Sequence, residues 1–360
     1  MESIRSKLLS PGSSAKLGSF NSQKVPKNCL LHMVPLTQGN WFYQSRFKIQ
    51  ISWLFFKNSD FTSDLNPIYA QIAKKLPSPI YKLLAQFYMD QNFPRHLFIE
   101  TTATCNLSCS YCPREKIRQD MDFELFRKII NEASKYGTRS FSLHLFGEPL
   151  LYPRILDAIR YIKETNKRHV VLVTTNGTKI NEFAEELIAL KIDQVFWTWR
   201  TEATFNESTL ETLRKWGRFR VRFIKEITPE DQYKKWSKWP NLETRSLHNY
   251  GGDIETWKFG ETRSRAQPSK WEFRWPCYHL WFAPAISWNG NILICCSDPH
   301  QKEVIGKFPQ MSIHNAWTSE KFKSIRDSHL KGKYAGICAK CDVWKEYPDV
   351  FFKWQKTKSA

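Results

Sequence analysis

Three cysteines within eight residues constrain the fold of this chain more than any other feature. Cys105, Cys109 and Cys112 have the spacing C-x3-C-x2-C, and the next cysteine is Cys277. Three thiolates on one short loop can bind three irons of a 4Fe-4S cluster and leave the fourth iron open. A structural zinc site would need a fourth Cys or His close by, and a ferredoxin loop has another spacing with a fourth cysteine soon after. Both alternatives are therefore disfavoured.

A second group of cysteines lies near the end of the chain. It comprises Cys277, Cys295, Cys296, Cys338 and Cys341, so that of the nine cysteines only Cys29 stands apart. Clustering of this kind indicates metal binding in a reducing compartment rather than the disulfides of a secreted protein. Four thiolates from three separate places can enclose a cluster or a zinc ion.

The middle of the chain alternates between predicted strands and predicted helices. Hydrophobic periodicity predicts strands at 96–101, 140–146, 169–175, 193–199, 219–227 and 242–248. It predicts helices at 123–136, 153–166, 180–190, 207–216 and 229–236. Six such units imply parallel strands with right-handed crossovers, in an open partial barrel short of the eight units that close one. The cysteine loop then lies at the edge where the strands end.

The flanking segments have weaker patterns. Residues 67–92 have a rough helical period that Pro77 and Pro79 interrupt, and residues 253–276 have none. Near the C-terminus, residues 286–294 predict a hairpin in which Asn289 and Gly290 both take positive φ angles. Residues 312–329 predict one helix.

Two short motifs end the second and third predicted strands. The first is Phe146-Gly147-Glu148-Pro149, in which glycine lets the backbone approach a ligand closely and the carboxylate can pair with an ammonium group. The second is Thr174-Thr175-Asn176-Gly177-Thr178. Each motif alone is an ordinary turn. Their place after consecutive strands, beside the cysteine loop, favours a ligand site.

These motifs, in this order, resemble those of the radical S-adenosylmethionine (radical SAM) enzymes, over about residues 96–345. The resemblance implies that Cys105, Cys109 and Cys112 hold a 4Fe-4S cluster whose open iron binds S-adenosylmethionine (SAM). It also implies a set of SAM-binding residues, in which Gly147 and Glu148 contact the methionine amino group, Thr175 and Asn176 line the pocket and Tyr111 lies near the adenine. No catalytic residue beyond the cluster ligands is assigned.

Two positions depart from the family pattern. Phe146 replaces the first glycine of the usual Gly-Gly-Glu-Pro motif. The fourth strand ends with Thr198 and Arg200 instead of the Ser-x-Asp-Gly type sequence of many relatives. Arg200 is accordingly expected to bind either the carboxylate of SAM or the substrate.

The C-terminal segment resembles the SPASM/twitch domain of the same enzymes, whose opening motif matches Cys277, Gly290 and Cys295. The resemblance implies one auxiliary 4Fe-4S cluster with Cys277, Cys295, Cys338 and Cys341 as ligands. Cys296 could exchange roles with Cys295, and zinc with the same ligands is the alternative. The expected α/β organisation is a partly helical extension (1–95), a partial (β/α)6 barrel core (96–252), a connector (253–276), the SPASM/twitch-like domain (277–345) and a tail (346–360).

The resemblance also implies a function. A flavodoxin- or ferredoxin-type donor would supply the electron that cleaves SAM to a 5′-deoxyadenosyl radical, which abstracts hydrogen from a substrate. The expected substrate is a peptide or protein side chain, or a small sugar-like molecule. The net charge of +19 suits an anionic partner. An RNA-modifying enzyme and a non-catalytic metal-binding interaction protein are the alternatives. No apolar run approaches the ~18 residues of a membrane span, and a cytoplasmic location is expected.

Overall fold

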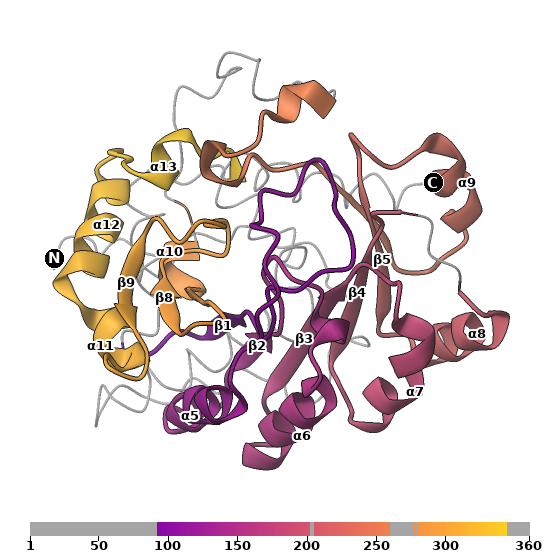
Figure 1. Cartoon of the computed structure of the whole chain (residues 1–360), viewed down its shortest axis with the longest axis horizontal. Coiled ribbons are helices and arrows are strands. Elements are labelled where there is room, and N and C mark those ends of the chain that lie inside the picture. The colour runs from indigo at the N-terminus through magenta and orange to yellow at the C-terminus, as the bar shows by residue number, and fades with distance from the viewer. Residues whose placement is uncertain (1–91, 202–204, 260–276, 278, 344–360) are drawn as a thin grey trace, which may run out of the picture. The chain divides into compact units, whose positions relative to one another are not determined.

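A computed structural model describes residues 92–201, 205–259, 277 and 279–343 of the chain (Figure 1). Most of the predicted N-terminal extension, with its helix at 67–92 and Cys29, lies outside the described residues. The predicted tail and residues 260–276 of the predicted connector also lie outside them.

One nine-stranded sheet runs through the described part, in the order β6-β5-β4-β3-β2-β1-β7-β8-β9. The parallel strands are β1 (His96–Ile99), β2 (Ser140–Ser142), β3 (Val170–Thr175), β4 (Gln194–Thr198), β5 (Phe219–Ile224) and β6 (Leu242–Arg245). The C-terminal strands are β7 (Ala285–Ile286), β8 (Asn291–Leu293) and β9 (Val304–Lys307). Because β6 and β9 are both edges, the sheet is open, and the predicted partial barrel is confirmed.

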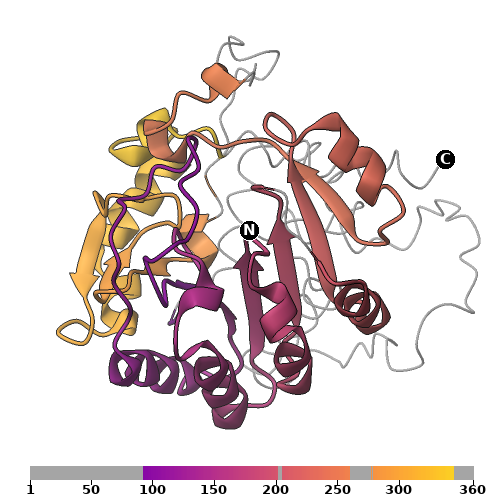
Figure 2. The same cartoon turned by 45° about the vertical axis from the view of Figure 1, so that its right-hand side comes forward.

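Helices connect the parallel strands and cover one face of the sheet (Figures 1 and 2). They are α5 (Phe123–Ser134), α6 (Ile155–Thr165), α7 (Ile180–Ala189), α8 (Glu207–Trp216) and α9 (Glu230–Trp236). Asp122 begins α5 as its N-cap, since its carboxylate accepts a hydrogen bond from the Leu125 N–H at 2.8 Å. The predicted alternation of strands and helices is thus confirmed, and most boundaries agree within a few residues.

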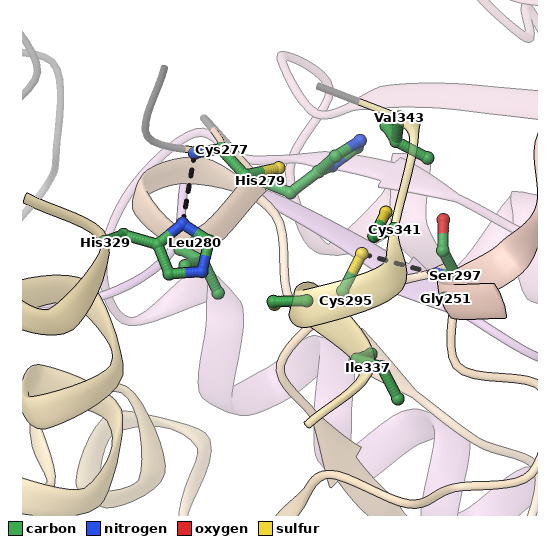
Figure 3. A pocket seen from close by; sticks show the side chains of 11 residues that line it. Gly251, Cys277, His279, Leu280, Cys295, Ser297, His329, Ile337, Cys341 and Val343 are labelled. Atoms are coloured by element: carbon green, nitrogen blue, oxygen red, sulfur yellow. Dashed lines mark hydrogen bonds between the residues drawn. The ribbon is translucent and has the colours of Figure 1, made fainter. Parts of the chain in front are cut away.

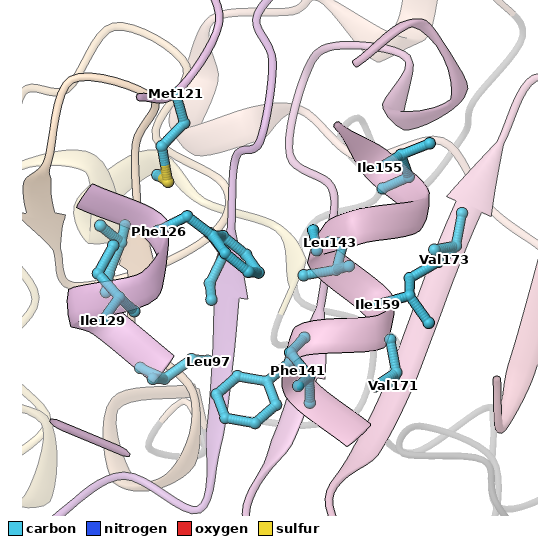
Figure 4. Close-up of a cluster of buried hydrophobic side chains, with 14 of the residues drawn as sticks. Leu97, Met121, Phe126, Ile129, Phe141, Leu143, Ile155, Ile159, Val171 and Val173 are labelled. Atoms are coloured by element: carbon cyan, nitrogen blue, oxygen red, sulfur yellow. The ribbon is translucent and has the colours of Figure 1, made fainter. Parts of the chain in front are cut away.

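The core lies between the sheet and these helices. Alternate strand residues such as Leu97, Phe141 and Val171 pack against Phe126 of α5 and Ile159 of α6 (Figure 4). Because side chains alternate across a strand, the residues between them face the other side of the sheet. That concave face is polar: His96 and Ser140, for example, are buried there with 2.6 Å between the imidazole Nδ1 and the hydroxyl Oγ.

The C-terminal segment departs from the prediction in three ways. First, β7 pairs in parallel with β1, so that the cysteine-rich segment extends the main sheet. Second, only Gly290 of the hairpin turn has a positive φ (+85°), because residues 287–290 form a four-residue loop rather than a two-residue turn. Third, the predicted single helix is two helices, α11 (Ile313–Thr318) and α12 (Glu320–Leu330). They divide at Ser319, whose hydroxyl accepts from the Phe322 N–H and so caps α12.

Short helical segments complete the fold. They are η3 (Pro149–Leu151), η4 (Tyr250–Gly252), η5 (Thr256–Phe259), α10 (His279–Phe282) and α13 (Ile337–Lys340). Among the described residues, no helix combines the length and the apolar character that crossing a membrane requires.

Candidate active site

The loop that carries the first three cysteines is closed at its base by a short antiparallel ladder. The Ala103 N–H donates to the Gln119 carbonyl, and the Met121 N–H donates to the Thr101 carbonyl, both at 2.8 Å. At the tip, the Cys112 N–H donates to the Cys109 carbonyl at 3.1 Å. The Arg114 guanidinium binds the Cys105 and Leu107 carbonyls at 3.3 and 2.9 Å. These bonds fix a long loop that has little core of its own.

Glu148 joins this loop to the ends of β2 and β3. The Glu148 N–H donates to the Thr104 carbonyl at 2.8 Å. Its carboxylate accepts from the Thr175 hydroxyl at 2.6 Å and from the Asn176 N–H at 2.7 Å. The side chain is only 2% exposed, and burial raises its pKa to about 7 despite these bonds. In the structure Glu148 therefore holds the end of β3 in place, in addition to any contact with a ligand.

Asn176 continues the same junction toward the first cysteine. Its side-chain Nδ2 donates to the side-chain Oδ1 of Asn106 at 2.9 Å and lies 3.9 Å from the Cys105 sulfur. Its backbone carbonyl accepts from the Trp197 indole at 3.0 Å. The structure thus brings together Cys105, Glu148, Thr175 and Asn176, as the sequence motifs suggested. Asn106 was missed, although its position directly after the first cysteine is a usable signal.

Gly147 is required by the backbone of the chain itself. A Cβ atom at this position would lie 2.0 Å from the Thr102 carbonyl oxygen and 3.0 Å from that of Thr104. The sequence motif predicted that the backbone at Gly147 approaches a ligand closely. In the structure, the close approach is to the backbone at the base of the cysteine loop, where the Gly147 loop crosses it.

Arg200 and Tyr111 lie together on the other side of the cysteines. The Arg200 guanidinium carbon is 5.2 Å from the centre of the Tyr111 ring, a cation–π contact. Arg200 also interacts electrostatically with Cys109, and its Nη1 is buried without a hydrogen-bond partner in the described structure. A buried guanidinium nitrogen without a partner is suited to receive an anionic group from a ligand.

Four C-terminal cysteines line one cavity (Figure 3). They are Cys277 before α10, Cys295 after β8, Cys338 in α13 and Cys341 after it. Cys296 does not line this cavity. His329 supports the site, because its Nδ1 accepts from the Cys277 N–H at 3.3 Å.

Glu100, at the end of β1, is a buried carboxylate that the sequence reading missed. It is 5% exposed, and it accepts from the Phe146 N–H at 3.4 Å and the Trp288 N–H at 3.3 Å. It therefore bridges the Gly147 loop and the hairpin loop between β7 and β8. Burial raises its pKa from 4.5 to about 7, although both N–H groups act to lower it. A carboxylate near the end of the predicted strand at 96–101 was the available signal.

We expect Glu100 to make the protein less stable as the pH rises. Because its pKa is higher in the folded state, its stabilising contribution is complete below about pH 4.5 and is lost as the pH approaches 7, by up to about 3 kcal/mol. Glu100→Gln should flatten this part of the profile, measured as urea unfolding free energy between pH 5 and 8. Exchange of the exposed Glu185 for Gln is the control and should leave the slope unchanged. Equal slopes in wild type and Glu100→Gln would contradict the expectation.

The polar concave face has buried atoms without hydrogen-bond partners. Within the described structure they include His144 Nδ1 after β2, Thr174 Oγ1 on β3 and Thr198 Oγ1 on β4. Burial and the charges of Arg222 and Arg245 lower the pKa of His144 to about 3, so its imidazole is neutral. The two arginines flank Glu243, whose carboxylate pairs with both. Hydroxyl and imidazole groups without partners can bind a polar ligand.

The residues present fit the groups that the motifs imply. Thiolates are the usual ligands of iron–sulfur clusters, and three lie on one loop while four line one cavity. The Leu107 N–H points at the Cys105 sulfur at 3.5 Å, the kind of hydrogen bond that tunes a cluster. Burial raises the pKa of the Cys105, Cys112 and Cys277 thiols, so cluster binding releases protons.

Comparison with protein families identifies two domains in the chain. Residues 99–198 match the radical SAM superfamily, and residues 277–342 match the SPASM iron-sulfur cluster-binding domain. The chain therefore contains a radical SAM domain and, after it, a SPASM domain. The radical SAM domain implies a 4Fe-4S cluster and SAM, and the SPASM domain implies a further iron–sulfur cluster. The C-terminal cysteines thus belong to an iron–sulfur domain, and the zinc alternative is not supported.

Individual relatives are similar over different shares of the chain. The tungsten-containing aldehyde ferredoxin oxidoreductase cofactor-modifying protein of Pyrococcus furiosus is 36% identical over 110 residues, 29% of this chain and 30% of its own length. The match thus spans about a third of the length of the first curated relatives. The S-adenosyl-L-methionine-dependent 2-deoxy-scyllo-inosamine dehydrogenase of Niallia circulans is 23% identical over 253 residues, 68% of this chain and 91% of its own length.

A solved radical SAM structure has the same fold. The crystal structure of BtrN in complex with AdoMet and 2-DOIA superimposes with a TM-score of 0.53 and 21% identity. The match covers 69% of this chain and 92% of that one.

Proposed function

We propose that the chain is a radical SAM oxidoreductase with one auxiliary cluster. Cys105, Cys109 and Cys112 hold the catalytic 4Fe-4S cluster, and the auxiliary cluster takes Cys277, Cys295, Cys338 and Cys341. One observation carries this proposal: four thiols line a single cavity in the C-terminal segment. The strands of that segment, β7–β9, extend the same sheet whose parallel strands β1–β6 carry the three-cysteine loop. Cys105, Cys109 and Cys112 would hold a cluster that passes one electron from the external donor to SAM, which would split into methionine and a 5′-deoxyadenosyl radical able to abstract hydrogen. The four C-terminal cysteines would hold a cluster able to accept an electron from the substrate.

In this proposal the residues around the cysteine loop bind SAM. Arg200 offers its unpartnered Nη1 to the SAM carboxylate, and Tyr111 packs beside it. Glu148 fixes Thr175 and Asn176, whose positions define the end of β3. Gly147 and Glu148 face the methionine part.

We favour a small polar substrate over a peptide or protein side chain. Three unpartnered polar atoms, those of His144, Thr174 and Thr198, come from neighbouring strands and face the concave side, where hydroxyl groups of a substrate could pair with them. The relative that matches over most of its own length is named as a dehydrogenase of an inosamine, a compound with several hydroxyl groups. The net charge of +19 suits an anionic group on the substrate and an acidic flavodoxin- or ferredoxin-type donor. The described cysteines form no disulfides with one another, which suits the reducing cytoplasm.

The test is anaerobic reconstitution of the full chain. About eight irons per chain and 5′-deoxyadenosine formation after reduction would support the proposal. Deuterated aminocyclitols and a deuterated peptide would then be compared, and deuterium should enter 5′-deoxyadenosine from the small polyol. Deuterium transfer from the peptide alone would reject the substrate class. No cleavage of SAM would reject the enzyme.

A further inference from the structure

Tyr250 has a backbone conformation that costs free energy. Its φ is +47°, in the left-handed region that favours glycine, and the two following glycines have φ angles of +71° and +96°. For a residue with a large side chain this conformation costs about 1–2 kcal/mol. Such strain persists only where surrounding contacts impose it. Contacts on both sides of Tyr250 impose this conformation.

On one side, the turn is hydrogen-bonded to the end of α13 and to the residues that follow it, the segment that contains Cys338 and Cys341. The Asn249 side-chain amide donates to the Lys340 carbonyl at 2.7 Å. The Asn249 N–H donates to the Asp342 carboxylate at 3.0 Å, and the Asp342 N–H donates back to the Asn249 side chain at 3.1 Å. All three bonds join the turn to Lys340 and Asp342, the residues on either side of Cys341.

The two glycines bring the turn close against α13. A Cβ atom on Gly251 would lie 3.0 Å from the Ile337 Cβ, and one on Gly252 would lie 2.8 Å from the Lys340 Cβ. Gly251 also lines the cavity of the four cysteines (Figure 3). The turn is thus held in place by segment 337–342, and it keeps its position only while that segment is ordered. The segment supplies two of the proposed auxiliary ligands.

On the other side, the Tyr250 side chain faces the proposed SAM site. Its ring meets the Phe146 ring edge-on, with 5.7 Å between the centres. Its hydroxyl lies close to the positively charged Arg200 guanidinium and near the Cys112 thiol. Phe146 directly precedes Gly147, and Arg200 stacks on Tyr111. One side chain therefore contacts or interacts with three parts of the SAM site.

We infer that Tyr250 is a positioning residue through which the auxiliary-cluster segment 337–342 orders the SAM site. The inference rests on the proposed function, because it assigns Arg200 and the Gly147 loop to SAM. Ligation of Cys338 and Cys341 orders α13, α13 fixes the turn at residues 249–252, and the turn holds Tyr250 against Phe146 and Arg200. Coupling of this kind is reciprocal, so SAM should also order α13.

The test measures SAM binding, without reduction and therefore without turnover, on the reconstituted full chain. Tyr250→Gly removes the side chain yet suits the positive φ, so the backbone is not penalised. We expect the Kd for SAM to rise about tenfold, within the usual range of coupling between two sites. Tyr250→Phe keeps the ring and should recover part of the affinity. Lys191→Gly is the matched control, because Lys191 also has a positive φ (+57°) and lies on the exposed surface. It should leave the Kd unchanged.

A double-mutant cycle tests the route of the coupling. Replacing Cys338 and Cys341 by alanine should weaken SAM binding, and adding Tyr250→Gly should weaken it by less than about twofold more, because both changes break the same connection. Hydrogen exchange gives a second readout: SAM should slow exchange of residues 337–342 in wild type but not in Tyr250→Gly. The inference would be overturned if the two changes raised the Kd for SAM by factors that multiply in the combined variant. It would also be overturned if Tyr250→Gly alone left the Kd unchanged. Either result would leave the proposed function intact. Wild type that does not bind SAM would overturn both.

Discussion

Replacing Cys105 with alanine should remove one cluster and abolish SAM cleavage. Its thiol lies at the centre of the junction, 3.9 Å from the Asn176 amide and on the loop that Thr104 ties to Glu148. A cluster that has lost one of three ligands has no other cysteine on the loop to replace it. Iron should fall by about four per chain, and 5′-deoxyadenosine should drop below detection. Cleavage that persists at a tenth of the wild-type rate or more would contradict the assignment.

The matched control is Cys296→Ala. Cys296 neighbours a proposed ligand but does not line the cavity of the other four thiols. Its removal should therefore leave both the iron content and SAM cleavage close to wild type. A loss of about four irons in this variant would instead make Cys296 the ligand, in place of Cys295.

Gly147→Ala should lower both the unfolding free energy and the affinity for SAM, the second-largest effect that we expect. Its Cβ would lie 2.0 Å from the Thr102 carbonyl oxygen, which is backbone and cannot rotate away as a side chain could. The Gly147 loop or the base of the cysteine loop must therefore move. Overpacking of this kind costs about 1–3 kcal/mol of unfolding free energy, occasionally more. Because Glu148 moves with its neighbour, we also expect the Kd for SAM to rise at least about tenfold, or about 1.4 kcal/mol.

Gly137→Ala separates the close approach from the general cost of losing a glycine. Gly137 has a φ of +87°, and a Cβ there would meet nothing within 4 Å. This variant should lose about 1 kcal/mol through its backbone conformation alone and bind SAM normally. The comparison uses urea unfolding and equilibrium binding of SAM. Equal affinities in the two variants would show that the crossing at Gly147 does not shape the site.

The regular part of the fold could be predicted from the sequence because it depends on local periodicity. Strands such as β3 and helices such as α8 follow from alternating or 3.6-residue apolar patterns. The pairing of β7 with β1 could not be predicted, because β7 has only two residues and its partner lies almost 200 residues earlier. The break between α11 and α12 was also missed, since a serine inside a helical pattern does not by itself reveal that it caps the second helix.

The candidate site was predictable where chemistry is concentrated in one short segment. The cysteine spacings and the motifs after β2 and β3 indicated which strand ends meet, and the structure brings those residues together. The contacts of Glu100 and Tyr250 were not predictable. Glu100 bonds to N–H groups 46 and 188 residues away, and Tyr250 depends on a turn held by a distant helix. Single residues that act through tertiary contacts leave little trace in periodicity or spacing.

The pairing of β7 with β1 also bears on the integrity of the protein as a unit. The Phe98 N–H donates to the Pro284 carbonyl at 3.1 Å, and the Glu100 N–H donates to the Ile286 carbonyl at 2.9 Å. A chain cut before residue 277 would leave the amides of Phe98 in β1 and of Glu100 just after it without these partners, beside the buried Leu97 and Ile99. A new, unprotected edge of this kind favours aggregation. The C-terminal segment thus covers the edge of β1. We expect a chain shortened to its radical SAM domain to aggregate, so its catalysis could not be measured.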